Sequence, residues 1–152
     1  MQTLYRVLAF VVVGLVAVQA ASHAWGSAGL VKYLSEGGTL DMDAMTPFTE
    51  VAGYVIHAMN GMYVIPAVAV ILLTVAFISR NSVAIIWAAV VAVLVVLLVA
   101  FGLLGHETTA FAFLHGITAV ALAGAALVAA LRVQLATGGH QSRTAQHAVQ
   151  NR

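Results

Sequence analysis

Four long apolar segments, separated by polar ones, dominate the pattern of the chain. They run from about Leu4 to Trp25, Phe48 to Ile78, Val83 to Leu104 and Thr109 to Leu135. Each is long enough to cross the hydrocarbon layer of a bilayer, because about 20 helical residues span roughly 30 Å. The runs are continuous rather than alternating, which favours helices over the strands of a barrel. The sequence therefore predicts an all-α, four-helix transmembrane bundle.

Two short polar turns support this count of helices. The turn 80–82 separates the second and third segments, and Ser82 is the candidate N-cap of the third helix. Residues 105–108 separate the third and fourth segments in the same way. We expect Pro66 to kink the second helix, because it cannot donate the hydrogen bond to Met62.

The connection between the first two segments, 26–47, is the longest in the chain. It mixes apolar and charged residues in a pattern typical of a short amphipathic helix on the outer membrane surface. The residues concerned are Leu30, Val31, Lys32, Tyr33, Leu34 and Glu36. Gly37 and Gly38 are expected to end this helix, and Pro47 to open the second span.

The composition agrees with a membrane protein. Of the 152 residues, 62% are apolar and 7% are charged, and the mean hydropathy is +1.04. Soluble domains are about 45–50% apolar and about 25% charged. A single domain of this size cannot hide that excess of apolar side chains from water, so lipid is the solvent that fits the chain.

The distribution of charge predicts the orientation. A cytoplasmic N-terminus places every arginine on the cytoplasmic side and leaves Lys32 alone outside. The arginines are Arg6, Arg80, Arg132, Arg143 and Arg152. The acids then all lie outside; they are Glu36, Asp41, Asp43, Glu50 and Glu107. We therefore predict cytoplasmic termini, a membrane domain at residues 1–136 and a flexible cytoplasmic tail at 137–152.

Several classes of function are excluded or disfavoured. The chain has no cysteine, which excludes disulfides, thiolate metal sites and thiol nucleophiles. Its net charge is +1 and its basic residues are scattered, which argues against a nucleic acid as a partner. The sequence has no glycine-rich phosphate loop, no serine nucleophile with a partner and no pair of carboxylates within a span. It therefore gives no sign of an enzyme.

Four of the six histidines fall in the outer half of the predicted bundle, one per helix: His23, His57, His106 and His115. Ionisable groups are costly in a bilayer and usually mark a function. His57 and His115 occupy matching places in the second and fourth spans, about 10–15 Å below the helix starts at about 1.5 Å per residue. This match is the main sign of a weak likeness between the two halves of the chain.

Two facing imidazoles at one depth are the axial ligands that haem iron accepts, and a helical bundle is a normal place for that cofactor. We therefore predict one haem b between His57 and His115, with Asn60 as a hydrogen-bonding neighbour. Small residues beside the ligands would leave room for the flat macrocycle; they are Gly53, Gly61, Ala112, Gly116 and Ala119. Close helix packing is the alternative explanation of these small residues.

His23 and His106 form a candidate second pair, near the outer ends of the first and third helices. Gly102 lies one turn before His106 and is expected to leave space on that face. A second haem at this pair stays open, as does simple hydrogen bonding between helices by neutral imidazole. The expected difference in depth argues against one metal centre made from all four histidines.

The motif HAMNG that begins at His57, together with His115 in the fourth span, resembles one four-helix half of the haem A synthase family. Members of that family place haem-ligating histidines in the second and fourth helices on the outer side, which implies this role for His57 and His115. The arginine that usually follows the first histidine is Ala58 here, and Glu50 is the one nearby carboxylate. The resemblance therefore implies a small bacterial plasma-membrane cytochrome b with bis-histidine ligation, rather than haem A synthesis.

Two other functions remain open. Copper or zinc handling at the outer face would combine the histidines with acids and thioethers, and thioethers suit copper(I); the methionines are Met42, Met45, Met59 and Met62. A cofactor-free subunit of a larger complex would dock through faces of small residues, which would equally serve a homodimer. An electron-transfer role would add a redox partner or a quinone to the lipid bilayer as partners.

Overall fold

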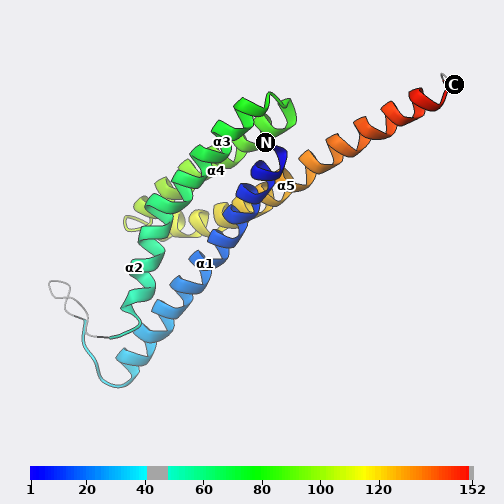
Figure 1. Cartoon of the computed structure of the whole chain (residues 1–152). Coiled ribbons are helices and arrows are strands. Elements are labelled where there is room, and N and C mark those ends of the chain that lie inside the picture. The colour runs from blue at the N-terminus through cyan, green and yellow to red at the C-terminus, as the bar shows by residue number, and fades with distance from the viewer. Residues whose placement is uncertain (41–47, 151–152) are drawn as a thin grey trace.

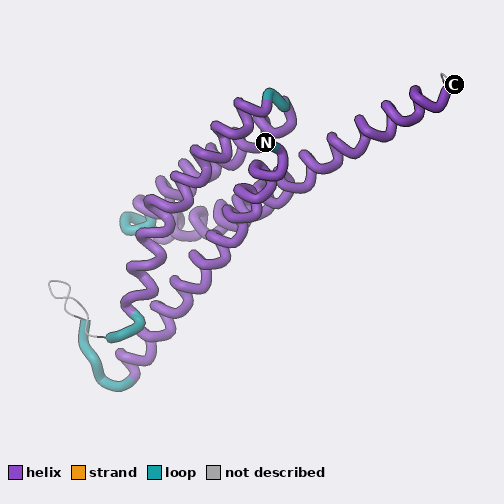
Figure 2. Tube along the Cα trace, viewed as in Figure 1, coloured by secondary structure: helices purple, strands orange, loops and turns teal. Residues whose placement is uncertain are grey.

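The computed structural model describes the backbone of residues 1–40 and 48–150, and the side chains of 1–40 and 48–133. The described chain is helical and holds no strand. Its elements are α1 (Gln2–Ser35), α2 (Val51–Met59), the π-helical turn η1 (Asn60–Val64), α3 (Ile65–Ser79), α4 (Ser82–Leu104) and α5 (Thr109–Gln150) (Figures 1 and 2).

Four helical stretches in the described part of the chain are long and apolar enough to cross a membrane. They are Gln2–Ser35, Val51–Ser79, Ser82–Leu104 and Thr109–Val133. The second stretch consists of α2, η1 and α3 in succession. The predicted all-α chain with four candidate membrane spans is therefore confirmed.

The four spans pack as a bundle with a defined order. The first span, α1, packs against α2, α3 and α5, and α4 packs against α3 and α5. The second span and α5 therefore occupy diagonal positions, separated by α1 on one side and α4 on the other. The N-terminus, the turn between α3 and α4, and the point where α5 leaves the bundle all lie at the same end (Figure 1).

The apolar core occupies the half of the bundle nearest this end. Its largest fully buried side chains are Tyr5, Val12, Ile65, Leu72, Val91, Leu122 and Val133. Alanines fill much of the remaining interior, which allows the helices to pack closely. Farther from the termini, the buried polar side chains are Gln19, Ser22, Asn60 and Thr118. The bundle thus changes along its length from an apolar core to a polar layer.

The turn between α3 and α4 differs from the sequence prediction in one detail. Arg80 ends α3 in the left-handed region, at φ 52°. The amide oxygen of Asn81 then accepts hydrogen bonds from the backbone N–H groups of Val83 (3.0 Å) and Ala84 (3.2 Å). Asn81 is therefore the N-cap of α4 and the prediction of Ser82 was wrong. Asparagine is as strong a cap as serine and stands one residue earlier.

The second span contains an irregular turn immediately before Pro66. The backbone N–H of Ile65 bonds to the carbonyl of Asn60, five residues back, as in a π-helix. Pro66 has no N–H to donate, so the regular i to i−4 pattern is interrupted at this point in any case. The π-helical turn thus lies just before the residue at which we expected a kink, and such turns are frequent at functional sites.

At two places where the sequence predicted a boundary, the structure has one continuous helix. The segment expected to form a separate amphipathic helix belongs to α1, which ends at Ser35 and is followed by Gly37 at φ 92°. Its place on a membrane surface stays a prediction, and Pro47 lies outside the described residues. At the other end, α5 passes residue 136 without a break and reaches Gln150. The flexibility expected of 137–152 also stays a prediction.

Candidate histidine site

Three histidine rings from three helices meet in the polar layer. His57 of α2 lies between His23 of α1 and His115 of α5, with ring centres 5.0 Å and 6.0 Å apart respectively. We call these three residues the histidine cluster. His57 and His115 come from the diagonal spans, so their rings meet across the bundle as the sequence predicted. The ring planes of this pair are inclined by 56°.

His57 and His115 are held in the same way, each by a main-chain carbonyl of a neighbouring helix. The Nδ1 of His57 lies 3.0 Å from the carbonyl oxygen of Gln19 on α1. The Nδ1 of His115 lies 2.8 Å from the carbonyl oxygen of Leu98 on α4. A carbonyl only accepts, so each Nδ1 carries the proton, and in the neutral ring the lone pair is on Nε2. Metal-ligating histidines are usually oriented in this way.

Gly102 makes the space that His115 occupies. A Cβ atom on Gly102 would lie 3.1 Å from both Cε1 and Nδ1 of the His115 ring. Leu98, whose carbonyl accepts the ring proton, is one turn earlier on the same helix. We had expected Gly102 to leave room beside His106, but the structure uses that room for His115.

The glycines near His57 serve a different purpose from the one that we expected. A Cβ atom on Gly53 would lie 2.7 Å from the backbone nitrogen of Gly26, and one on Gly61 would lie 2.5 Å from Nε2 of Gln19. The space beside both glycines is therefore filled by α1, which is the close-packing alternative. Beside His115, Gly116 has open space around it, Ala112 is exposed and Ala119 is half-buried.

His23 is the outer member of the cluster. It is exposed, and its ring meets that of Tyr54 edge to face at 5.6 Å. Its Nδ1 lies 3.3 Å from the hydroxyl of Ser27, which in turn accepts a hydrogen bond from the hydroxyl of Tyr54 at 3.2 Å. The sequence placed His23 with His106, at a different depth from His57. The structure instead brings it against His57, on the side where α1 and α2 approach each other.

His106 lies apart from the cluster. It is exposed, in the turn between α4 and α5. The ring contacts within the described chain join His23 to His57 and Tyr54, but not to His106. The second haem that the sequence left open for a pair of His23 and His106 therefore has no ring contact to support it in the described chain.

The ligands expected for copper or zinc are not gathered in the described chain. No group of three histidine, aspartate or glutamate side chains within it is placed to hold a metal ion. Met59 and Met62 are 54% and 40% exposed. Met42 and Met45, with Asp41 and Asp43, lie outside the described residues.

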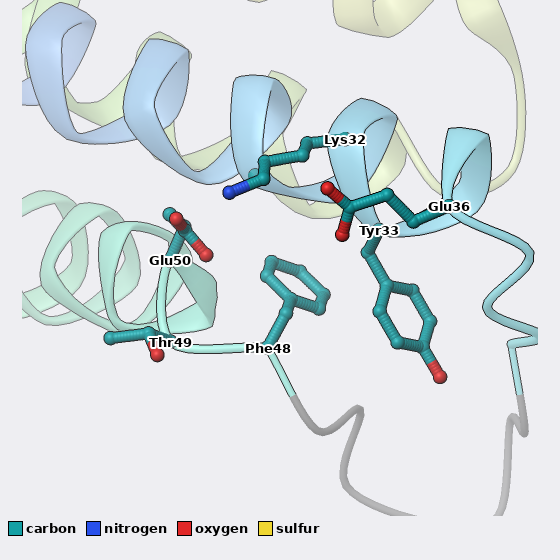
Figure 3. A pocket seen from close by; sticks show the side chains of 7 residues that line it. Lys32, Tyr33, Glu36, Phe48, Thr49 and Glu50 are labelled. Carbon is teal, nitrogen blue, oxygen red and sulfur yellow. The ribbon is translucent and has the colours of Figure 1, made fainter.

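A separate cleft lies beyond the histidines, at the end of the bundle opposite the termini. Its volume is about 240 Å³, and it is lined by Gly29, Lys32, Tyr33, Glu36, Phe48, Thr49 and Glu50 (Figure 3). Tyr33 and Phe48 stack in it with ring centres 5.8 Å apart. None of the clustered histidines lines this cleft. Lys32, the cation nearest to the predicted outer surface, therefore belongs to the cleft rather than to the histidine site.

Sequence reasoning found the three clustered histidines and Asn60 but missed the roles of Leu98 and Gln19. Both act on the histidines through main-chain carbonyls, and a carbonyl is present at every residue, so no residue type signals it. Comparisons with protein-family models, with curated proteins and with solved structures find no match to this chain.

Proposed function

We propose that this chain is a membrane haem b-binding protein in which His57 and His115 are the two axial ligands. The observation that carries the proposal is the pair itself. Two half-buried imidazoles on diagonal spans lie 6.0 Å apart, and each uses Nδ1 in a bond to a main-chain carbonyl. Nε2, the atom that a haem iron would need, is left unprotonated on both rings.

The separation of the two rings agrees with shared ligation of one atom. Metal–nitrogen bonds of about 2 Å, and about 1 Å from each nitrogen to its ring centre, put the centres of two such imidazoles about 6 Å apart. The ring centres of His57 and His115 have this separation. Room for the macrocycle has to come from faces other than those of Gly53 and Gly61, because α1 fills the space beside them.

Two axial histidines favour electron transfer, or the holding and sensing of haem, over oxygen activation, because no position on the iron stays open. Bound haem would supply a one-electron change between ferric and ferrous iron. The protein would keep both ligands neutral and oriented in a low-dielectric layer. A redox partner or a quinone is the acceptor class that such a role requires, and a homodimer stays open.

We also propose the orientation and the location. Arg6 near the start of α1, Arg80 after α3 and Arg132 on α5 belong to the end of the bundle that holds the termini. Lys32 and Glu107 belong to the other end. By the positive-inside rule the terminal end faces the cytoplasm, which puts the histidine cluster toward the outer surface. The bacterial plasma membrane is the location that we propose.

The test is a reduced-minus-oxidised spectrum of the full chain purified in detergent, with iron analysis. We expect a Soret band and about one haem per chain. The variants His57→Ala and His115→Ala should each lose most of the bound haem, because a low-spin iron needs both ligands. His106→Ala is the matched control, since that histidine lies outside the cluster, and it should keep its haem. A wild-type protein with neither iron nor a Soret band would end the proposal.

A metal-ion site is the second candidate, favoured by the third imidazole of His23, 5.0 Å from His57. It has less support than haem, because no group of three histidine, aspartate or glutamate side chains in the described chain is placed to hold a metal ion. Elemental analysis of the same preparation separates the two functions: copper or zinc without iron would support the metal-ion site. A preparation that holds no metal at all would support a cofactor-free structural subunit.

A further inference from the structure

A buried pair of amide side chains lies next to His57. Gln19 of α1 and Asn60 of η1 are each only 6% exposed. The Nδ2 of Asn60 donates one hydrogen bond to the carbonyl of Leu15 at 3.0 Å and another to Oε1 of Gln19 at 3.1 Å. Such a pair costs more to place in a membrane interior than two apolar side chains of the same size, so it calls for an explanation.

The hydrogen bonds fix the orientation of both amides. The carbonyl of Leu15 can only accept, so the amide nitrogen of Asn60 has to face it. The same nitrogen then faces Gln19, which must present its oxygen, and the NH₂ group of Gln19 is turned toward Gly61. The Oδ1 of Asn60 is left buried without a partner among the described residues. A buried acceptor of this kind lowers stability, so the pair is not explained by stability alone.

The amide pair is connected directly to His57. The backbone carbonyl that accepts the His57 ring proton belongs to Gln19 itself. Asn60 follows His57 by three residues, so both lie on the same side of the second span, and Asn60 begins the π-helical turn. Each member of the pair thus ties the helix that carries the imidazole to the helix that carries its acceptor.

We infer that Gln19 and Asn60 are positioning residues for His57, which hold its acceptor carbonyl in place and keep its ring as the Nδ1–H tautomer. This inference rests on the proposed function only for its effect on haem, because the tautomer is a property of the chain without haem. Within the described part of the chain His115 has no such amide pair: its acceptor is on Leu98, and the residue three positions after it is Thr118. The two ligands are therefore supported unequally.

The first measurement uses the haem-free full chain labelled with ¹⁵N-histidine in detergent. The ring signals of His57 are assigned by their disappearance in His57→Ala. In the wild type we expect Nδ1 protonated and Nε2 unprotonated. Asn60→Leu and Gln19→Met, which fill similar volumes without the amides, should shift His57 toward a mixture of tautomers. Thr118→Val, at the matching place after His115, should leave His57 unchanged.

The second measurement is the reduction potential of the haem-loaded protein. Loss of a well-aligned Nδ1–H bond makes imidazole a weaker donor to ferric iron, so the potential should rise in Asn60→Leu and in Gln19→Met. The reduction potential of the double variant should rise no further than that of the single variant with the larger effect, because both changes break one network. Thr118→Val should keep the wild-type potential.

The outcomes separate this inference from the proposed function. An unchanged His57 tautomer in either well-folded amide variant overturns the positioning role, whether or not haem binds. A wild-type chain without haem, but with the tautomer shift, overturns the proposed function and leaves the positioning role standing. If Asn60→Leu does not accumulate as a folded protein, Gln19→Met gives the same decision, since it keeps the main-chain carbonyl that His57 needs.

Discussion

At the scale of single residues, His57 and His115 satisfy their polar rings in the same way, through a carbonyl of the helix beside them. A neutral imidazole in a membrane needs a partner for its N–H group, and the main chain of a helix is the nearest fixed acceptor. The Gln19 carbonyl also accepts a hydrogen bond from the hydroxyl of Ser22 at 3.1 Å. The Nδ1–H group of each ring thereby has a partner, and Nε2 keeps its lone pair.

The contact between Gly102 and His115 gives a prediction at this scale. In Gly102→Val the added carbons would meet a ring that already lies 3.1 Å from the position of a Cβ atom. We expect the ring to be displaced from the Leu98 carbonyl, a loss of stability of about 1–3 kcal/mol from overpacking, and weaker haem retention. Haem content and the thermal midpoint in detergent measure both effects.

Gly14→Val is the control for this change, because a Cβ atom at Gly14 meets no other atom within 4 Å. It should keep the wild-type haem content and midpoint. Equal losses in the two variants would mean that any bulky residue at a helix glycine disturbs the fold, and that Gly102 has no particular role at His115.

At the scale of elements, the hairpins α1–α2 and α4–α5 repeat one arrangement. In each, a histidine on the second helix donates to a carbonyl on the first, Gln19 in one and Leu98 in the other. Four residues after that carbonyl stands His23 in the first hairpin and Gly102 in the second, and each is close to the donating ring. The weak likeness that we noted between the halves of the sequence thus has a structural counterpart.

The contact between α1 and α2 gives a prediction for the first hairpin. Gly53 faces the backbone of Ser22 and Gly26, and main-chain atoms cannot move aside as a flexible side chain can. Gly53→Ala should therefore push the helices apart, lower stability by about 1–3 kcal/mol and weaken the contact between His23 and His57.

Thermal unfolding in detergent, with the haem content of the folded fraction, measures this change. The control is Gly124→Ala on α5, where the added Cβ atom meets nothing within 4 Å. A helix glycine in open space should be neutral or slightly stabilising when replaced by alanine. A destabilisation at Gly124 as large as that at Gly53 would contradict close packing as the role of Gly53.

At the scale of the whole molecule, the two layers of the bundle have different contents: one holds the apolar core and the other holds the histidines. The apolar core near the termini joins all four spans. The polar layer beyond it holds the histidines, where α2 packs chiefly against α1 and the π-helical turn. The stable packing is therefore concentrated in one half, and the candidate site lies in the other half.

The absence of cysteine allows a direct test of the orientation. Thr39→Cys lies after α1, and Ser82→Cys lies at the start of α4, at the opposite end of the bundle. With cytoplasmic termini, a membrane-impermeant maleimide should label Thr39→Cys in intact cells and Ser82→Cys only after the cells are opened. The reverse pattern would show that the charge distribution misled us and that the histidines face the cytoplasm.

The sequence by itself determined the number of candidate spans and the helical fold. These depend on the length and composition of segments, and in lipid a long apolar run has few alternatives to a helix. The third span is a clear example, since the turn 80–82 and the run from Val83 to Leu104 marked α4 almost to the residue.

Only the tertiary structure decided which groups meet. In the structure His23 contacts His57 rather than His106. The ring of His115 occupies the space beside Gly102, and α1 fills the space beside Gly53. The rotation of each helix about its axis and the crossing of helix pairs set these contacts. A run of almost uniformly apolar residues indicates neither the rotation nor the crossing, because lipid and protein interior accept the same side chains.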